Sequence, residues 1–221
     1  MWKCKGQMSE SIWVGILLSI TGGFQDAYTY FCRDHVFANG QTGNMVLMGE
    51  KLATGKWAGA LRYFIPVLAF ATGIYTAEKI RHKYQWSKKI HWRQIVVIIE
   101  AILLFLVGWI PQTYNLCANI IVSFVCALQI ESFRKVLGNS YASTMCIGNL
   151  RIATEALCNY RATGNKVLRK KSITYYTFII IFIIGAATGG ILTAQFGDKA
   201  IWICSILLIC SFLVMFINEN E

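Results

Sequence analysis

The sequence predicts an all-α, polytopic membrane protein with about six transmembrane helices and two interrupted, polar segments. Of its 221 residues, 56% are hydrophobic and only 14% are charged, and the mean hydropathy is +0.49. Such a composition leaves too little polar surface for a soluble globular protein. Two further observations shape the prediction: the apolar residues fall into stretches of helical length, and a polar motif occurs once in each half of the chain.

Six apolar stretches are the candidate spanning helices. Most of them approach the roughly 17–25 residues that cross a hydrocarbon core. In chain order they are 12–31, 58–77, 94–110, 117–130, 172–194 and 200–217. The first stretch lacks a small-residue cleavage pattern and contains Asp26, so we interpret it as a retained helix rather than a signal peptide. We expect residues 1–221 to form a single membrane domain.

The two halves of the chain resemble each other. Asp26 and the pair Gly43-Asn44 are matched, 105 residues later, by Glu131 and the pair Gly148-Asn149. An Ala-Thr-Gly triplet at 71–73 also recurs at 187–189. We therefore assign residues 10–110 and 115–217 as two pseudo-symmetric repeats. Duplicated halves with polar groups at matching membrane depths are typical of transporters and channels.

Basic residues concentrate in two loops, and this sets the predicted orientation. The first loop carries Lys79, Arg81, Lys83, Lys88, Lys89 and Arg93, and the second carries Arg161, Lys166, Arg169, Lys170 and Lys171. The positive-inside rule places both loops in the cytoplasm. Juxtamembrane lysines of this kind suit contact with anionic membrane lipid. They explain the net charge of +10 without nucleic acid as a partner.

Three candidate segments lie between these loops, and three crossings would put the loops on opposite faces. The most polar segment, 139–157, contains Arg151 and Glu155. We interpret it as interrupted or re-entrant, because a charge at mid-membrane costs about 2.5–3.5 kcal/mol. Its counterpart is 36–53, with a break at 39–44. Each repeat then crosses three times, which inverts the second repeat and leaves both termini in the cytoplasm. The alternative is that all eight segments cross the membrane.

Polar residues in and beside the interrupted segments are the candidate solute-binding residues. A broken helix frees backbone groups that coordinate solutes. Asn44 and Asn149 either contact the solute or brace the breaks. The intramembrane acids Asp26 and Glu131 indicate a solute pathway, a proton relay or ion pairs. The structural partners would be Arg33 or His35 for Asp26, and Arg134 or Arg151 for Glu131. The predicted substrate-binding residues are Gln25, Asp26, Gln41, Thr42, Asn44, Glu131, Asn149 and Arg151.

Two glycines and one further acid in the apolar segments also have predicted roles. Gly43 and Gly148 are expected to be sites of close backbone approach, and more sensitive to large side chains than Gly185. Glu100 has no counterpart in the other half, and we interpret it as the partner of Arg93 or as a residue near the inner surface.

The sequence gives no support for an enzyme, a cofactor or a metal site. Its eight cysteines contain no CxxC pair, and its three histidines all lie in loops. Nucleotide-binding, nucleophile-elbow and zinc-protease motifs do not occur in it.

The run from Gly22 to Tyr28, followed by the run from Phe37 to Asn44, resembles the YoaK-type family of uncharacterised bacterial integral membrane proteins. The stretch from Gly148 to Arg151 is similar to that family's second motif, although Ile147 stands where the family usually has threonine. The resemblance implies an inner-membrane protein of about six helices. It implies no mechanism.

The leading hypothesis is a multi-pass transporter or channel of the cytoplasmic (inner) membrane for a small solute or an ion. Its path would run between the two interrupted segments, with proton coupling through Asp26 and Glu131 as one option. The alternative is a non-transporting binding or sensing subunit with a structural polar core. Inverted repeats serve ions, water and organic solutes alike, so the sequence does not specify the substrate. Homo-oligomerisation is compatible with either reading.

Overall fold

The computed structural model describes residues 11–86, 91–136, 139–140 and 146–215. The described chain is helical, except that β1 (Lys135–Val136) pairs with β2 (Asn139–Ser140) in a short antiparallel ladder. The helices are α1 (Ile12–Cys32), α2 (Gln41–Ala53), α3 (Trp57–Tyr84), α4 (Trp92–Val107), α5 (Asn115–Ser132), α6 (Cys146–Thr163), α7 (Lys166–Phe196) and α8 (Trp202–Val214), with 3-10 helices η2 (Gln112–Tyr114) and η3 (Gly197–Ile201). The predicted all-α class is confirmed.

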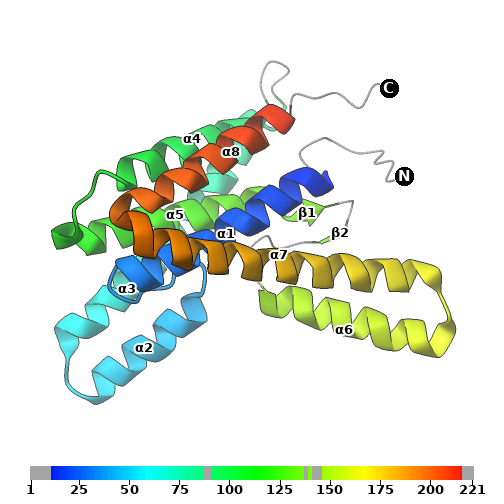
Figure 1. Ribbon diagram of the computed structural model, residues 1–221, viewed down its shortest axis with the longest axis horizontal. Helices are drawn as coiled ribbons and strands as arrows, with labels where there is room; N and C mark the ends of the chain where they lie inside the picture. Colours follow the sequence, from blue (N-terminus) through cyan, green and yellow to red (C-terminus); the bar gives the residue numbers. More distant parts are fainter. Residues whose placement is uncertain (1–10, 87–90, 137–138, 141–145, 216–221) are drawn as a thin grey trace.

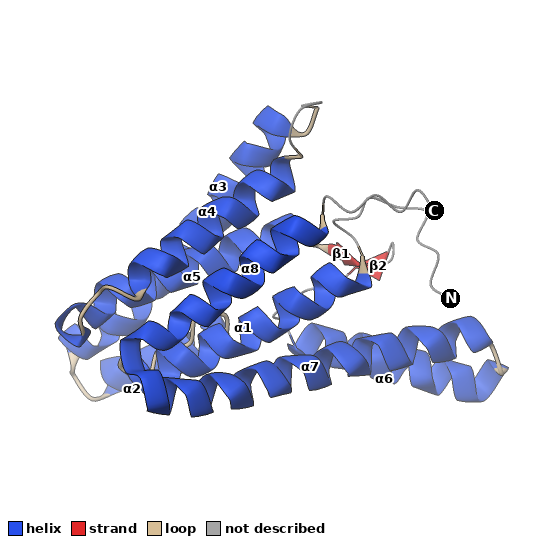
Figure 2. Ribbon diagram, turned by 45° about the horizontal axis from the view of Figure 1, so that its top comes forward, coloured by secondary structure: helices blue, strands red, loops and turns tan. Residues whose placement is uncertain are grey.

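The helices form an elongated bundle with two distinct ends (Figure 1). One end carries the start of α1, the end of α8 and the turn between α6 and α7, whereas the other carries η3, the α2–α3 turn and the α4–α5 connection (Figures 1 and 2). The helices α2 and α6 begin near the middle of the molecule and run toward opposite ends. The long helices that follow them, α3 and α7, return along the length of the bundle.

Helices from the two halves of the chain pack against each other. The main partner of α1 is α7, and the main partner of α3 is α5. The helix α4 lies against both α5 and α8, while α2 and α6 lie on α3 and α7 respectively. An apolar core joins α1, α4, α5 and α8, and it includes Leu18, Leu104, Val122 and Leu208. Because these contacts cross from one half to the other, the described chain is one packed unit.

Three segments of the described chain are long and apolar enough to cross a membrane. They are Trp57–Tyr84, Gln112–Ser132 and Lys166–Val214, the last of which contains both α7 and α8. Large apolar side chains on α3 and α7, such as Leu68 and Ile184, are exposed. Lipid, rather than water, is the solvent in which such a surface is stable. These features support a membrane protein, while the count of six crossings stays a prediction.

The first interruption falls earlier than predicted. Helix α1 ends at Cys32, and Asp34 and His35 adopt left-handed conformations with φ of 63° and 59°. Helix α2 starts at Gln41, so residues 41–44 of the predicted break are helical. Gly40 is the N-cap residue of α2, and the chain therefore leaves helical geometry over residues 33–40. In the second half, residues 147–157 are continuous helix, and residues 141–145 of the predicted segment lie outside the described chain.

The expected steric role of the Gly-Asn glycines is wrong for Gly148. A Cβ atom added at Gly148 would meet no atom within 4 Å. At Gly43 the nearest atoms belong to the flexible side chain of Phe37, whose ring lies 2.9 Å from the added Cβ. Gly148 lies near the start of α6 on its exposed face. No other helix of the described chain packs closely against it there, so a side chain at this position would meet no obstacle.

The close backbone approaches lie instead where long helices cross. A Cβ atom at Gly23 of α1 would overlap the carbonyl oxygen of Phe182 on α7, and Gly185 of α7 likewise abuts the backbone of α1. In the other pair, a Cβ atom at Gly73 of α3 would lie 2.6 Å from the carbonyl oxygen of Phe124 on α5. Glycine at these positions lets helix backbones approach closely, as in other membrane helix pairs.

We expect Gly185→Ala to destabilise the protein and Gly148→Ala to leave its stability nearly unchanged. The added methyl group at position 185 meets backbone atoms of Ile20 that cannot move aside, and overpacking of this kind costs about 1–3 kcal/mol. The matched change at position 148 points into open space. Thermal unfolding of the two purified variants in detergent measures the difference. Equal melting temperatures would show that the α1–α7 crossing tolerates a side chain.

Candidate functional site

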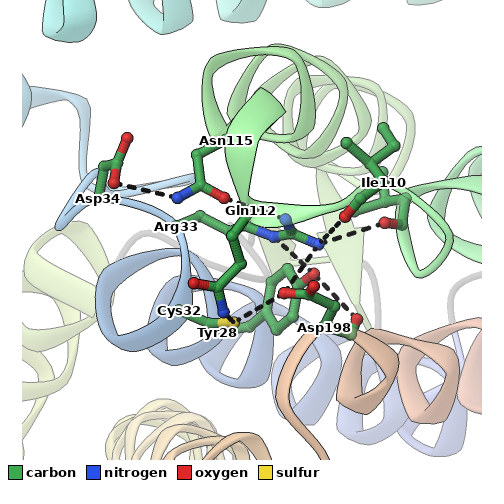
Figure 3. Close-up of polar contacts among 9 residues, drawn as sticks. Tyr28, Cys32, Arg33, Asp34, Ile110, Gln112, Asn115 and Asp198 are labelled. Carbon is green, nitrogen blue, oxygen red and sulfur yellow. Dashed lines mark hydrogen bonds and ion pairs between the residues drawn. The ribbon is translucent and has the colours of Figure 1, made fainter.

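A fully buried arginine organises the polar contacts at the η3 end of the bundle. Arg33 donates from Nε to Tyr28 Oη at 2.9 Å and from Nη1 to Asn115 Oδ1 at 3.0 Å. Its Nη2 donates to the carbonyl oxygen of Ile110 at 2.8 Å and lies 3.3 Å from Asp198 Oδ1. Figure 3 shows the guanidinium group in the midst of these partners. The arginine thus joins the end of α1 to the α4–α5 connection and to η3.

Further hydrogen bonds close this Arg33 cluster. Asn115 Nδ2 donates to Asp34 Oδ1 at 3.0 Å, and Tyr28 Oη donates to the carbonyl oxygen of Asp198 at 3.0 Å. Cys32 Sγ donates to Asp198 Oδ1 at 3.3 Å. The sequence offered Arg33 as an ion-pair partner for Asp26. The structure corrects this, because the guanidinium group extends beyond the end of α1 toward η3 and pairs with Asp198.

Asp26 and Asn44 hold the backbone of the first interruption. Asp26 Oδ1 accepts a hydrogen bond from the backbone N–H of Asn39 at 2.7 Å. Asn44 Oδ1 accepts from the N–H of Phe37 at 3.0 Å, and its Nδ2 donates to the carbonyl oxygen of Phe37 at 2.7 Å and to Gln41 Oε1 at 2.9 Å. The Asn44 side chain is fully buried. In this conformation Asn44 therefore braces the break.

The remaining residues of the interrupted segments differ in exposure. Thr42 is exposed in the first turn of α2, and Arg151 is exposed on α6. Asn149 is buried in the first turn of α6. Cys146, the first residue of α6, lies within electrostatic range of Asp26, which brings the start of the second polar helix near the first interruption.

Glu131 does not occupy an environment like that of Asp26. It pairs with Arg134 Nη2 at 2.7 Å, and Arg134 also contacts Glu78 of α3. Glu78 in turn pairs with Arg81 Nη1 at 3.0 Å. Of the two arginines expected as partners of Glu131, Arg134 is therefore the one that pairs with it, and a pairing with Arg151 is not among the contacts of the described residues. The difference has a simple origin, because α5 ends one residue after Glu131, whereas α1 continues for six residues beyond Asp26.

The sequence analysis assigned Glu100 to an ion pair with Arg93 or to the inner surface, and did not place it among the candidate site residues. This side chain is fully buried in α4, and neither carboxyl oxygen has a hydrogen-bond partner among the described residues. The expected partner Arg93 donates instead from Nε to the carbonyl oxygen of Ser132 at 2.9 Å. The signal was present in the sequence, because a lone acid in an apolar helix is a functional candidate by itself. Requiring a counterpart in the other half caused it to be discounted.

Gln25 lies in the same core and is half satisfied. Its Oε1 accepts a hydrogen bond from Cys126 Sγ at 2.6 Å, while its buried Nε2 has no partner among the described residues. Cys126 is within electrostatic range of Asp26, Glu100 and Cys204. These groups come from α1, α4, α5 and α8, so one buried region collects carboxyl, amide and thiol groups. The described residues hold no cluster of three or more metal-ligating side chains.

We expect Arg33→Met to reduce the free energy of unfolding by about 3–5 kcal/mol, because it removes one partner of a buried ion pair and strands several acceptors. Arg62→Met is the matched control. The exposed Arg62 lies 4.0 Å from Asp34 Oδ2, so its loss should change stability by only about 0–1 kcal/mol. Adding Asp198→Asn to Arg33→Met should recover part of the loss. Thermal melting of the four proteins provides the measurement, and similar values for both arginine variants would refute a structural role for Arg33.

Comparisons with known proteins agree with the motifs in the sequence. The chain is 21% identical over 201 residues to the UPF0700 transmembrane protein YoaK of Bacillus subtilis (strain 168), which covers 87% of this chain and 88% of the Bacillus protein. No solved structure matches the chain. The predicted resemblance to the YoaK-type family is confirmed. Residues 14–214 match the family model described as "Protein of unknown function (DUF1275)", and the chain therefore belongs to the DUF1275 family.

Proposed function

We propose that this protein transports a small solute or an ion across the cytoplasmic membrane, along a path between its two interrupted segments. The observation that carries the proposal is the placement of α2 and α6. Both helices begin near the middle of the molecule and run outward in opposite directions (Figure 1). The start of α6 lies within electrostatic range of Asp26 at the first interruption. Interrupted helices whose N-termini meet inside a membrane offer positive potential and free N–H groups to a solute.

Helix packing supports the proposed division into inverted repeats, residues 10–110 and 115–217. If α1 to α4 correspond to α5 to α8, exchanging the halves converts the α1–α7 pair into α5–α3. It also converts α2–α3 into α6–α7, and α4–α5 into α8–α1, so every principal contact has a counterpart. The recurring Ala-Thr-Gly triplet fits this exchange, because Gly73 abuts α5 and Gly189 abuts Phe24 of α1.

The charge distribution supports the proposed orientation. The basic turn between α6 and α7 lies at the same end of the molecule as the start of α1 and the end of α8 (Figure 2). Placing that end in the cytoplasm satisfies the positive-inside rule and puts both chain termini inside. On the opposite side, Lys51 is offset by Glu50, whose Oε2 lies 2.7 Å from Lys51 Nζ. The exposed lysines and arginines of α6 and α7 then face anionic lipid headgroups.

In this proposal the predicted residues take different roles. Thr42 and Gln41 at the start of α2, with Asn149 at the start of α6, contact the solute. Asn44 and Asp26 keep the interruption open by holding its backbone. The exposed Arg151 and the arginine-bound Glu131 lie at the margins of the path. A purely structural polar core is the competing function, and the internal hydrogen bonding of Asn44 and Arg33 favours it.

A flux measurement separates the two functions. Proteoliposomes containing the purified protein are exposed to osmotic gradients of glycerol, urea and potassium formate, and vesicle volume is followed by light scattering. We expect one solute class to enter faster than into empty vesicles, and Thr42→Val to slow that entry roughly 2–10-fold through loss of one hydrogen bond. Thr174→Val, on the exposed face of α7, is the matched control. Unchanged permeability to all three solutes, with the protein folded, would favour the structural alternative.

The orientation has its own test. In a background without native cysteines, Lys166→Cys at the start of α7 should react with an impermeant maleimide only from the cytoplasmic side. Thr54→Cys in the α2–α3 turn should react only from outside, because α2 does not cross the membrane in this arrangement. Labelling of both positions from the cytoplasm would contradict it and would favour eight crossing segments.

A further inference from the structure

The carboxyl group of Glu100 lies deep in the bundle. Glu100 is eight residues from Trp92, the first residue of α4, which corresponds to about 12 Å along the helix axis. Its exposed surface is 0%, and both oxygens lack hydrogen-bond partners among the described residues. The flanking turns of α4 are apolar and buried, as Val97 and Leu104 illustrate. A polar group in such surroundings is costly unless its charge or its hydrogen-bonding capacity is satisfied.

The region around Glu100 contains hydrogen-bonding groups but no described cation. Cys126 on α5 is within electrostatic range of Glu100, of Asp26 on α1 and of Cys204 on α8. On α3, the residues packed with α4 include Tyr84, which clusters with Trp92 and Val96 near the start of α4. The hydroxyl groups of Ser123 on α5 and Ser205 on α8 are buried and, within the described chain, also lack partners.

The two buried arginines are engaged elsewhere. Arg33 pairs with Asp198 at the η3 end, and Arg93 donates to the carbonyl oxygen of Ser132. An ionised carboxylate without a cation in the low-dielectric core of a membrane protein carries a desolvation penalty of several kcal/mol. A protonated carboxyl group avoids this penalty, because it is neutral.

We propose that Glu100 is a proton-binding site in the membrane core, and that its carboxyl group carries a proton in the conformation described here. The other two candidate acids, Asp26 and Glu131, already have interaction partners. Asp26 accepts a backbone hydrogen bond at the interruption, and Glu131 is paired with Arg134. Glu100 has neither kind of partner among the described residues.

Release of the proton requires a conformation in which water reaches Glu100. The O–H bond of the carboxyl group then breaks, the proton passes to that water as hydronium, and the carboxylate keeps the electron pair. Gln25 is hydrogen-bonded to Cys126 and has an unpartnered Nε2 within the described chain, and Ser205 lines a pocket with Val97 and Ala101 of α4. In that conformation these donors can turn toward the anion and stabilise it. Coupling of this exchange to solute movement rests on the proposed transport function, whereas the proton-binding site itself does not.

Infrared spectroscopy of the full chain in lipid membranes at neutral pH tests the site directly. A protonated carboxyl group has a C=O stretch separate from the amide and carboxylate bands, and that band shifts to lower frequency when the proton is exchanged for deuterium. We expect the band in the wild-type protein and its loss in Glu100→Gln. Glu155→Gln, which alters an exposed glutamate on α6, should retain it. Absence of the band from the wild-type protein would overturn the proposal.

Asp26→Asn identifies the residue that carries the proton. Loss of the band in Asp26→Asn and its retention in Glu100→Gln would assign the proton to Asp26 and overturn the proposal. Stabilisation of the wild-type protein by Na⁺ or K⁺ at constant pH, absent in Glu100→Gln, would make the site a metal-cation site instead. If Glu100→Gln fails to fold, the deuterium shift in the wild-type protein together with an unchanged spectrum of Asp26→Asn supports the proposal, and an absent shift refutes it.

The same preparation distinguishes this inference from the transport proposal. A Glu100 band in a protein that moves none of the tested solutes supports the site and contradicts transport. Solute flux without a protonated carboxyl band supports transport and overturns the Glu100 site. When both are present, loss of pH-dependent flux in Glu100→Gln, with pH-independent flux retained, supports the coupling role.

Discussion

Satisfying one buried cation constrains the whole η3 end of the bundle. Arg33 stands just past α1, and its contacts reach the α4–α5 connection and η3, which are separated from it by many residues along the chain. A guanidinium group has fixed planar geometry, so its partners must be held in matching positions. Tyr28 and Asn115 meet this requirement and are themselves hydrogen-bonded onward to Asp198 and Asp34. Movement of any one of these elements therefore disturbs the others.

The protein interior contains two kinds of polar cluster. The groups around Arg33 have hydrogen-bond partners, whereas some groups around Cys126 have none among the described residues. Around Arg33, Tyr28 and Asn115 each accept a hydrogen bond from the guanidinium group and donate another onward, which suits a structural anchor. Around Cys126, by comparison, Gln25 and Glu100 bury groups without partners among the described residues. Stability alone favours the first arrangement and disfavours the second. A costly polar group that persists in an apolar core is more readily explained by function than by folding.

The sequence predicted the helical class, because hydropathy is a local signal. It predicted an interruption near residues 39–44, but the chain leaves helical geometry over residues 33–40. It did not predict where helices touch. The close approaches at Gly23, Gly73 and Gly185 depend on which helices become neighbours, and that information is not local. The site was only partly predictable for the same reason. Asp26 and Asn44 hydrogen-bond the backbone of the interruption, but Asn44 does so from within α2 rather than from the break itself. The partner of Arg33 is Asp198, which is far from it along the chain and could be known only from the fold.

The exchange of packing partners between halves has a consequence for biosynthesis. Helices enter a membrane in chain order, and α3 is synthesised before α5, against which its Gly73 surface packs. Until α5 is inserted, the newly made α3 contacts α2 and, near Ala77, the start of α4, and its remaining surface faces lipid. The same holds for α1, which waits for α7, more than a hundred residues later. A ribosome-bound fragment ending after α4 would therefore be an assembly intermediate rather than a folded domain. Until the second half is inserted, membrane chaperones would have to shield it from proteases.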